Sequence, residues 1–215
     1  MTFAIVLFGW IFSLCLHEFS HALVAYYGGD TTVREKGYLT FNPLKYTHPL
    51  FSIILPLLFL LLGGIGLPGG AVYIERWRIR NRYWLSAMSL AGPMSNLLVA
   101  IILGLILRFS PTTASGIWPG LSFLLALQVS AMFFNLIPLP PFDGYSVLEP
   151  FLHPIVQMQV ERFRSVSIWV ILLMFWYVPF VSNVFWQGVF AFSTMLGVNW
   201  FLVVEGLHRF RFWEL

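Results

Sequence analysis

The sequence is poor in cysteine and in charged residues. It has one cysteine, Cys15, and 10% of its 215 residues are Asp, Glu, Lys or Arg. A single cysteine excludes an internal disulfide framework and a cysteine-based zinc cluster. Soluble domains carry about 25% charged residues, so the shortage of charge argues against a soluble enzyme. The net charge of +3 comes from basic residues scattered between apolar runs, which does not favour a nucleic-acid partner.

Long apolar runs take the place of charge, and 59% of the residues are hydrophobic. Runs of spanning length occupy roughly 3–27, 83–107, 118–141, 166–180 and 184–206. The first run begins at once and lacks a basic leader, which favours a span over a cleavable signal peptide. The sequence therefore predicts an all-α polytopic membrane protein with about five transmembrane helices, surrounded by a lipid bilayer.

A sixth apolar segment, roughly 49–67, is ambiguous because it contains Pro56 and ends in GGIGLPGG. If it dips in and returns, 11 of the 12 Lys and Arg residues fall on one side of the membrane and Arg108 alone on the other. If it crosses fully, the division is 8 to 4. The positive-inside rule favours the first arrangement. We therefore predict a re-entrant segment, an outside N-terminus and a cytoplasmic C-terminus, in what we expect to be the cell membrane.

Residues 68–82, PGGAVYIERWRIRNR, have a different pattern from the apolar runs. Arginines alternate there with other residues at a period of two, which predicts a short β element. One interpretation is an interfacial anchor whose arginines reach lipid phosphates. The other is an edge strand that pairs with an extended peptide substrate.

The polar residues of the first apolar run, HEFSH at 17–21, carry the strongest functional signal. His17 and His21 are four residues apart, so on a helix both imidazoles can reach one cation. Glu18 lies beside the first histidine, where it can take a proton from a water molecule activated by zinc without binding the metal itself. Ionisable groups at membrane depth are costly and by default mark a functional site.

Two histidines and a water leave zinc short of one protein ligand. Asp143 is the leading candidate, because Pro138, Pro140 and Pro141 break the helix before it and place it on a kinked segment at the mouth of a span. Other candidates, ranked below it, are His48, Glu149 and His153. For Asp143 to meet the histidines, the run at 118–141 must lie parallel to the first run, and the re-entrant arrangement produces that orientation.

At these residues the chain resembles the site-2 protease family of intramembrane zinc metalloproteases. The resemblance covers about two thirds of the chain and is carried in order by HEFSHALVAYYGG (17–29), AGPMSN (91–96) and NLIPLPPFDG (135–144). It implies that His17, His21 and Asp143 bind zinc, that Glu18 is catalytic, and that Asn135 helps to hold the substrate strand. The family often has LDG where this chain has Phe142-Asp143-Gly144. In AGPMSN, we expect Gly92, Pro93 and Asn96 to serve packing against the first helix more than substrate contact.

The resemblance also implies one zinc ion per chain and a substrate that is a transmembrane helix of another protein. We divide the chain into a catalytic core at 1–144 and a cytoplasmic loop with a C-terminal helical pair at 145–215. Two other functions stay open. An intramembrane metal carrier would use the same polar residues, although no inverted repeat is visible. An inactive family member would act as a scaffold.

Overall fold

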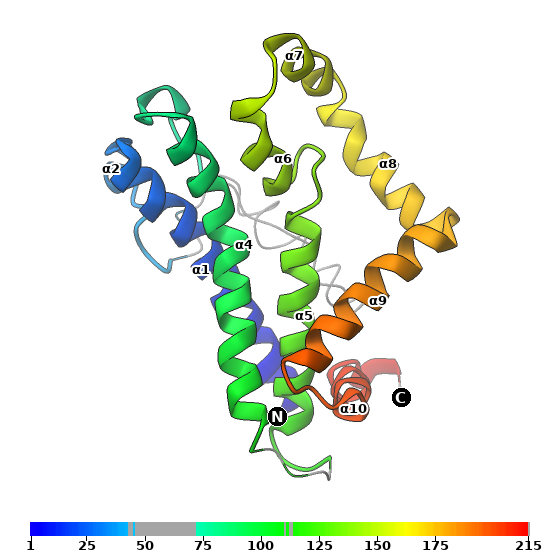
Figure 1. The fold of residues 1–215 in the computed structure, drawn as a ribbon. Coiled ribbons are helices and arrows are strands. Elements are labelled where there is room, and N and C mark those ends of the chain that lie inside the picture. The colour runs from blue at the N-terminus through cyan, green and yellow to red at the C-terminus, as the bar shows by residue number, and fades with distance from the viewer. Residues whose placement is uncertain (43–44, 46–71, 110, 112–113, 215) are drawn as a thin grey trace.

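The fold is a helical bundle, seen in a computed structural model that describes residues 1–42, 45, 72–109, 111 and 114–214 (Figure 1). The long and intermediate helices are α1 (Thr2–Gly28), α4 (Arg82–Leu107), α5 (Trp118–Asn135), α7 (Pro154–Arg162), α8 (Arg164–Tyr177), α9 (Pro179–Met195) and α10 (Trp200–Phe210). The short elements are α2 (Thr32–Glu35), η3 (Arg76–Arg78), α6 (Asp143–Leu148), η4 (Glu149–Phe151) and η5 (Phe212–Glu214). The described residues contain no strand, and the predicted re-entrant segment at 49–67 lies outside them.

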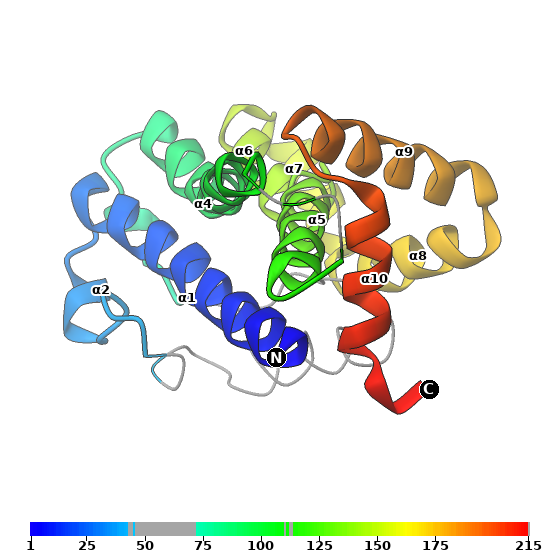
Figure 2. The same cartoon turned by 90° about the horizontal axis from the view of Figure 1, so that it is seen from below.

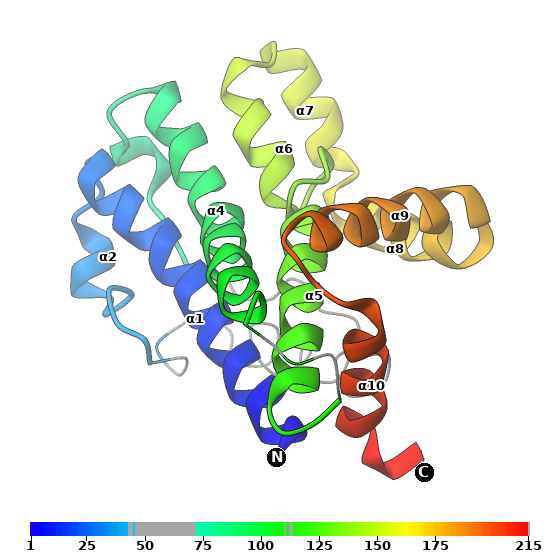
Figure 3. The same ribbon diagram turned by 60° about the horizontal axis from the view of Figure 1, so that its bottom comes forward.

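Helices α1, α4 and α5 form the centre of the bundle, and all three are long and apolar enough to cross a membrane. They correspond to the predicted runs at 3–27, 83–107 and 118–141. Figures 1 and 3 show that α1 and α5 run in the same direction, with α4 antiparallel to both. The parallel orientation of the first and third runs, which the candidate site required, is therefore confirmed.

The contacts between these helices are made by residues that are almost fully buried. Val6 on α1, Ala100 on α4, and Leu125 and Val129 on α5 are all 0% exposed and belong to one apolar cluster. Since the surroundings of a membrane protein are themselves apolar, close van der Waals packing rather than water exclusion holds such helices together. The bundle therefore fixes the position of any polar group that lies between α1, α4 and α5.

The connection from α1 to α4 begins and ends at the same end of the bundle. The amide of Arg80 donates to the carbonyl of Gly28 over 2.9 Å. The fully buried carboxylate of Asp30 accepts from the amide of Glu75 over 2.7 Å and from the amide of Thr32 over 3.0 Å. These bonds fasten residues 72–81, which we call the strap, to the C-terminal end of α1.

The predicted β element is wrong for the part of 68–82 that the structure describes. Residues 72–75 have no regular secondary structure, Arg76–Arg78 form the turn η3, and Arg82 already belongs to α4. The alternation fails because the side chains do not point to two opposite faces. Trp77 is 76% exposed, whereas Ile79 is buried against α1 and α4 as part of a second apolar cluster.

The C-terminal part of the chain also differs from the prediction. Helices α8 and α9 meet at a bend of 90° at Val178, so together they make at most one span. The predicted span at 184–206 is divided in two, because Gly197 has a φ of 92° that favours glycine and Asn199 caps the start of α10. Figure 2 shows α10 beside α5, on the side facing α8.

The two termini meet at the end of the bundle away from the strap. The ring of Phe3 lies 5.3 Å from that of Phe210 and 6.3 Å from that of Trp213. A chain whose ends lie together at one end of a bundle crosses it an even number of times. This arrangement does not confirm five crossings, and the sidedness of the termini, outside for the N-terminus and cytoplasmic for the C-terminus, stays a prediction. Within the described residues, three long helices and one bent pair give three to four candidate spans.

Cysteine accessibility in intact cells tests this topology. In a Cys15→Ala background, Trp213→Cys should react with a membrane-impermeant maleimide from the same side as Arg108→Cys, in the connection between α4 and α5. Arg80→Cys, in the strap, should react from the opposite side. Labelling of Trp213→Cys together with Arg80→Cys would contradict the arrangement of termini described above.

Candidate metal centre

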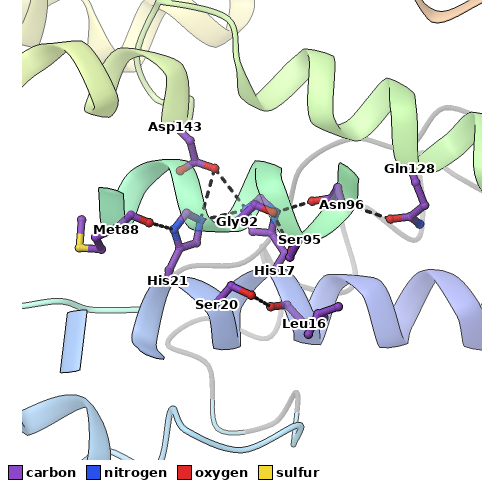
Figure 4. Close-up of polar contacts among 10 residues, drawn as sticks. All are labelled: Leu16, His17, Ser20, His21, Met88, Gly92, Ser95, Asn96, Gln128 and Asp143. Atoms are coloured by element: carbon purple, nitrogen blue, oxygen red, sulfur yellow. Dashed lines mark hydrogen bonds and ion pairs between the residues drawn. The ribbon is translucent and has the colours of Figure 1, made fainter. Parts of the chain in front are cut away.

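Helix α1 brings three polar side chains into the interior of the bundle. His17, Glu18 and His21 are 6%, 3% and 7% exposed, respectively. The two histidines are one helical turn apart and point to the same face, toward α4 and α6 (Figure 4). Their Nε2 atoms lie 3.0 Å from each other.

Asp143 approaches this face from the opposite side, because α5 ends at Asn135 and the proline-rich segment turns the chain back into α6. Asp143 is the first residue of α6. Gly144 permits the return, since a Cβ at that position would lie 2.7 Å from the carbonyl oxygen of Ile137 and would collide with that of Leu136. The aspartate-glycine pair therefore combines a ligand with the small residue that lets it reach α1.

The three candidate donor atoms form a compact triangle. Asp143 Oδ2 lies 3.2 Å from His17 Nε2 and 3.3 Å from His21 Nε2. Nitrogen and oxygen ligands at 2.0–2.2 Å from a tetrahedral zinc ion lie about 3.3 Å apart. The edges of the triangle, including the 3.0 Å between the two nitrogens, are close to that separation.

The hydrogen bond at Nδ1 of each ring determines whether its Nε2 atom carries a proton or a lone pair. His21 Nδ1 lies 2.7 Å from the carbonyl oxygen of Met88, which can only accept, so Nδ1 carries the proton. His17 Nδ1 donates to Asn96 Oδ1 over 2.6 Å. Both Nε2 atoms then present lone pairs toward a buried Asp143 oxygen that has no hydrogen-bond donor in the described part of the chain. Three lone pairs facing one another fit a cation, and His17, His21 and Asp143 have the ligand types of zinc.

Helix α4 approaches this triangle closely at Gly92. A Cβ there would lie 2.5 Å from His17 Nε2 and would also collide with His21 Nε2. The expectation that Gly92 serves close packing against the first helix agrees with this position. The packing also has a consequence for the site, because any side chain at 92 would occupy the space that the two imidazoles need.

Glu18 lies next to the triangle but is not one of the three clustered donors. Its carboxylate is in the electrostatic field of His17, His21 and Asp143, and the backbone of Val72 in the strap is within hydrogen-bonding reach. The strap therefore places a backbone group beside the carboxylate. This is the position that a proton-transferring group needs beside a metal.

The two lower-ranked candidates that the structure describes, Glu149 and His153, do not join the cluster. Glu149 pairs with Arg76 over 2.7 Å, and the exposed His153 caps α7. His48 lies outside the described residues. Asn135 is buried as the last residue of α5, where the proline-rich turn toward Asp143 begins.

Sequence reasoning missed the contact that Asn96 makes with His17. The motif at 91–96 suggested packing, whereas Asn96 is a direct hydrogen-bond partner of an imidazole in the cluster. It also missed Gln128, which is 0% exposed and bonded to Asn96. A glutamine in the middle of an otherwise apolar run was a signal that could have been read, because such a residue needs a buried partner.

The fold and the cluster define a helical membrane protein with a two-histidine, one-carboxylate site of the kind that holds zinc. Comparison with known proteins agrees with that class. The chain is 42% identical over 218 residues to the protein named "Putative zinc metalloprotease Rip2" of Mycolicibacterium smegmatis, covering 99% of this chain and 82% of that protein. It is 33% identical to "Putative zinc metalloprotease YwhC" of Bacillus subtilis, covering 82% of this chain and 81% of that protein. No family model and no solved structure matches.

The chain belongs to the site-2 protease family of zinc metalloproteases. Its relatives extend to "Putative zinc metalloprotease MJ0611" of Methanocaldococcus jannaschii, 27% identical over 74% of this chain. The alignment to Rip2 covers nearly the whole chain and so extends over the C-terminal residues, which carried none of the sequence motifs.

Replacing Gly92 by alanine should displace the imidazoles while leaving the rest of the bundle folded. We expect Gly92→Ala to lose at least 10-fold in zinc affinity, measured by competition with a chromophoric chelator in detergent. Gly188→Ala on α9 is the matched control, because its Cβ would make an ordinary contact at 3.7 Å with Phe133. Equal zinc affinity in both variants would show that Gly92 does not shape the site.

Proposed function

We propose that the protein is an intramembrane zinc endopeptidase that cuts membrane-spanning segments of other proteins. The observation that carries the proposal is the triangle of His17, His21 and Asp143 donors with Glu18 beside it, buried within the bundle of α1, α4 and α6. Membership of a zinc metalloprotease family supports hydrolysis. The depth of the site among apolar helices supports a substrate that arrives from the membrane.

His17, His21 and Asp143 are proposed to hold one zinc ion per chain. When bound, zinc supplies a Lewis acid that polarises the scissile carbonyl and lowers the pKa of a water molecule toward 7. Asn96 and the Met88 carbonyl keep the two imidazoles oriented, so the rings have little freedom to turn away.

Glu18 is proposed to be the proton-transferring residue. It takes a proton from the attacking water as the new C–O bond forms and then delivers that proton to the nitrogen, so that the C–N bond breaks and the amine departs. Its place beside the triangle, outside the group of three donors, supports this role.

The substrate is proposed to bind as an extended segment of a transmembrane helix. A helix hides its carbonyls in its own hydrogen bonds, so a scissile bond must leave the helix before it can be attacked. Asn135 is proposed to bond the unwound substrate strand from one side, and the backbone of the strap at 72–75 from the other. The bilayer is proposed to be the cell membrane.

Glu18→Gln separates catalysis from metal binding. We expect the variant to keep its zinc and to lose at least 100-fold in turnover, because the amide cannot accept the proton. The measurement is quantitative proteomics of membrane-protein fragments in cells with the wild type or the variant, together with the zinc content of each purified protein. A carrier would instead change zinc uptake and leave the fragments unaltered, which would overturn the proposal.

Asp143→Ala tests the third ligand. Two histidines alone hold zinc weakly, so we expect zinc affinity to fall by at least 100-fold and proteolysis to disappear with it. Glu149→Ala is the control, since that carboxylate pairs with Arg76. If the protein acts as an inactive scaffold, the cellular phenotype of Asp143→Ala will match that of the wild type.

A further inference from the structure

A line of buried polar side chains leaves the metal centre and runs toward the N-terminal half of α1. Asn96 on α4 is 4% exposed, Gln128 on α5 is 0% exposed, and Ser13 on α1 is 2% exposed. Three polar side chains from three apolar helices need partners, because unsatisfied groups are costly at membrane depth. Figure 4 shows the part of this line that joins His17, Asn96 and Gln128.

The hydrogen bonds of this line have one consistent direction, set by a backbone carbonyl at its far end. The carbonyl of Trp10 can only accept, so the Ser13 hydroxyl donates to it over 2.9 Å. The Ser13 oxygen must then accept from Gln128 Nε2, 2.9 Å away. That contact turns Gln128 Oε1 toward Asn96, whose Nδ2 donates to it over 2.9 Å.

Fixing the Asn96 amide fixes the proton on His17. With its Nδ2 held by Gln128, Asn96 can offer only Oδ1 to the ring, so His17 must carry its proton on Nδ1. The Nε2 lone pair is then free to face Asp143. An Asn96 amide turned over by 180° would present N–H groups to Nδ1 and would favour the tautomer with the proton on Nε2, which cannot bind a metal there.

The two histidines differ in how the proton is kept on Nδ1. His21 donates directly to the carbonyl of Met88, an acceptor that cannot turn over. His17 relies on a side-chain amide, which can. We propose that Gln128, held by Ser13, is a positioning residue that locks the Asn96 amide and thereby keeps the Nε2 lone pair of His17 available. This inference rests on the proposed function, because it assumes that His17 holds a metal ion.

Cobalt binding to the full-length protein in detergent tests the proposal without using catalysis. Gln128→Leu removes the amide oxygen and the amide nitrogen of the side chain at nearly constant volume. We expect the affinity for Co²⁺, followed by its visible absorption, to fall by about 10-fold or more. Leu125→Ala is the matched control, because Leu125 is also 0% exposed on α5 and belongs to the apolar cluster. It should lower the midpoint of thermal unfolding and leave Co²⁺ affinity unchanged.

A rescue experiment distinguishes positioning from simple cross-linking of helices. Both terminal atoms of a carboxylate are acceptors, so the side chain introduced by Asn96→Asp cannot present a donor to His17 in either orientation. Adding Asn96→Asp to Gln128→Leu should therefore recover most of the lost Co²⁺ affinity, whereas adding Asn96→Ala should not. A structural cross-link would not be restored by the carboxylate, so a failed rescue overturns the proposal.

Ser13→Ala provides a second variant should Gln128→Leu fail to fold, because alanine is well tolerated inside a helix. It removes the far anchor without touching Asn96, and we expect a loss of about threefold in Co²⁺ affinity. Wild-type Co²⁺ affinity in both Ser13→Ala and Gln128→Leu would overturn the positioning role of Gln128 and leave the protease proposal standing. Normal metal binding by the wild type without cleavage of membrane proteins would overturn the protease proposal and leave the positioning role of Gln128 intact.

Discussion

The convergence of three lone pairs inside an apolar bundle is the constraint on which the rest of the structure depends. Two imidazole nitrogens and a carboxylate oxygen lie within 3.0–3.3 Å of one another, and their lone pairs repel unless a cation lies between them. Such a site fits a divalent cation, and it requires helices that come very close together. The glycines at 92 and 144 meet that need, since each lies where a Cβ would strike the site or the turn that delivers Asp143.

The direction of the helices follows from the same constraint. Asp143 can reach α1 only if the C-terminal ends of α1 and α5 lie together, which requires the chain between α1 and α4 to return to the end from which it left. The bond between Arg80 and Gly28 and the contacts of Asp30 hold the two ends of that connection together. Because Val72 lies in the same strap, the fastening of the connection also places backbone beside Glu18. Topology and site are thus secured by one set of contacts.

The sequence predicted the centre of the fold better than its C-terminal part, for physical reasons. The spacing of His17 and His21 is local to one helix, and the prolines before Asp143 leave few conformations. Both features can therefore be predicted without knowledge of tertiary contacts. The prediction of a cytoplasmic C-terminus, which stays untested, counted Arg209 as a free positive charge. In the fold it pairs with Glu205 over 2.6 Å and donates to the carbonyl of Ala114 over 2.8 Å, so its charge is compensated. Gly197 interrupts an apolar run that hydropathy reads as continuous.

The line of hydrogen bonds from Trp10 to His17 could not be predicted from the sequence for a different reason. Gln128 and Ser13 are 115 residues apart in sequence, so their contact exists only after three helices have packed. This links packing to chemistry, because the helix interfaces that stabilise the bundle also decide on which nitrogen His17 carries its proton. The linkage works in both directions. A cation at 100 times its dissociation constant stabilises the folded state by about 2.7 kcal/mol, and here that stabilisation would act on α1, α4 and α6 together. Helices α8 and α9, whose side chains are mostly exposed in the described residues, contribute no donor to the triangle and so lie outside that linkage.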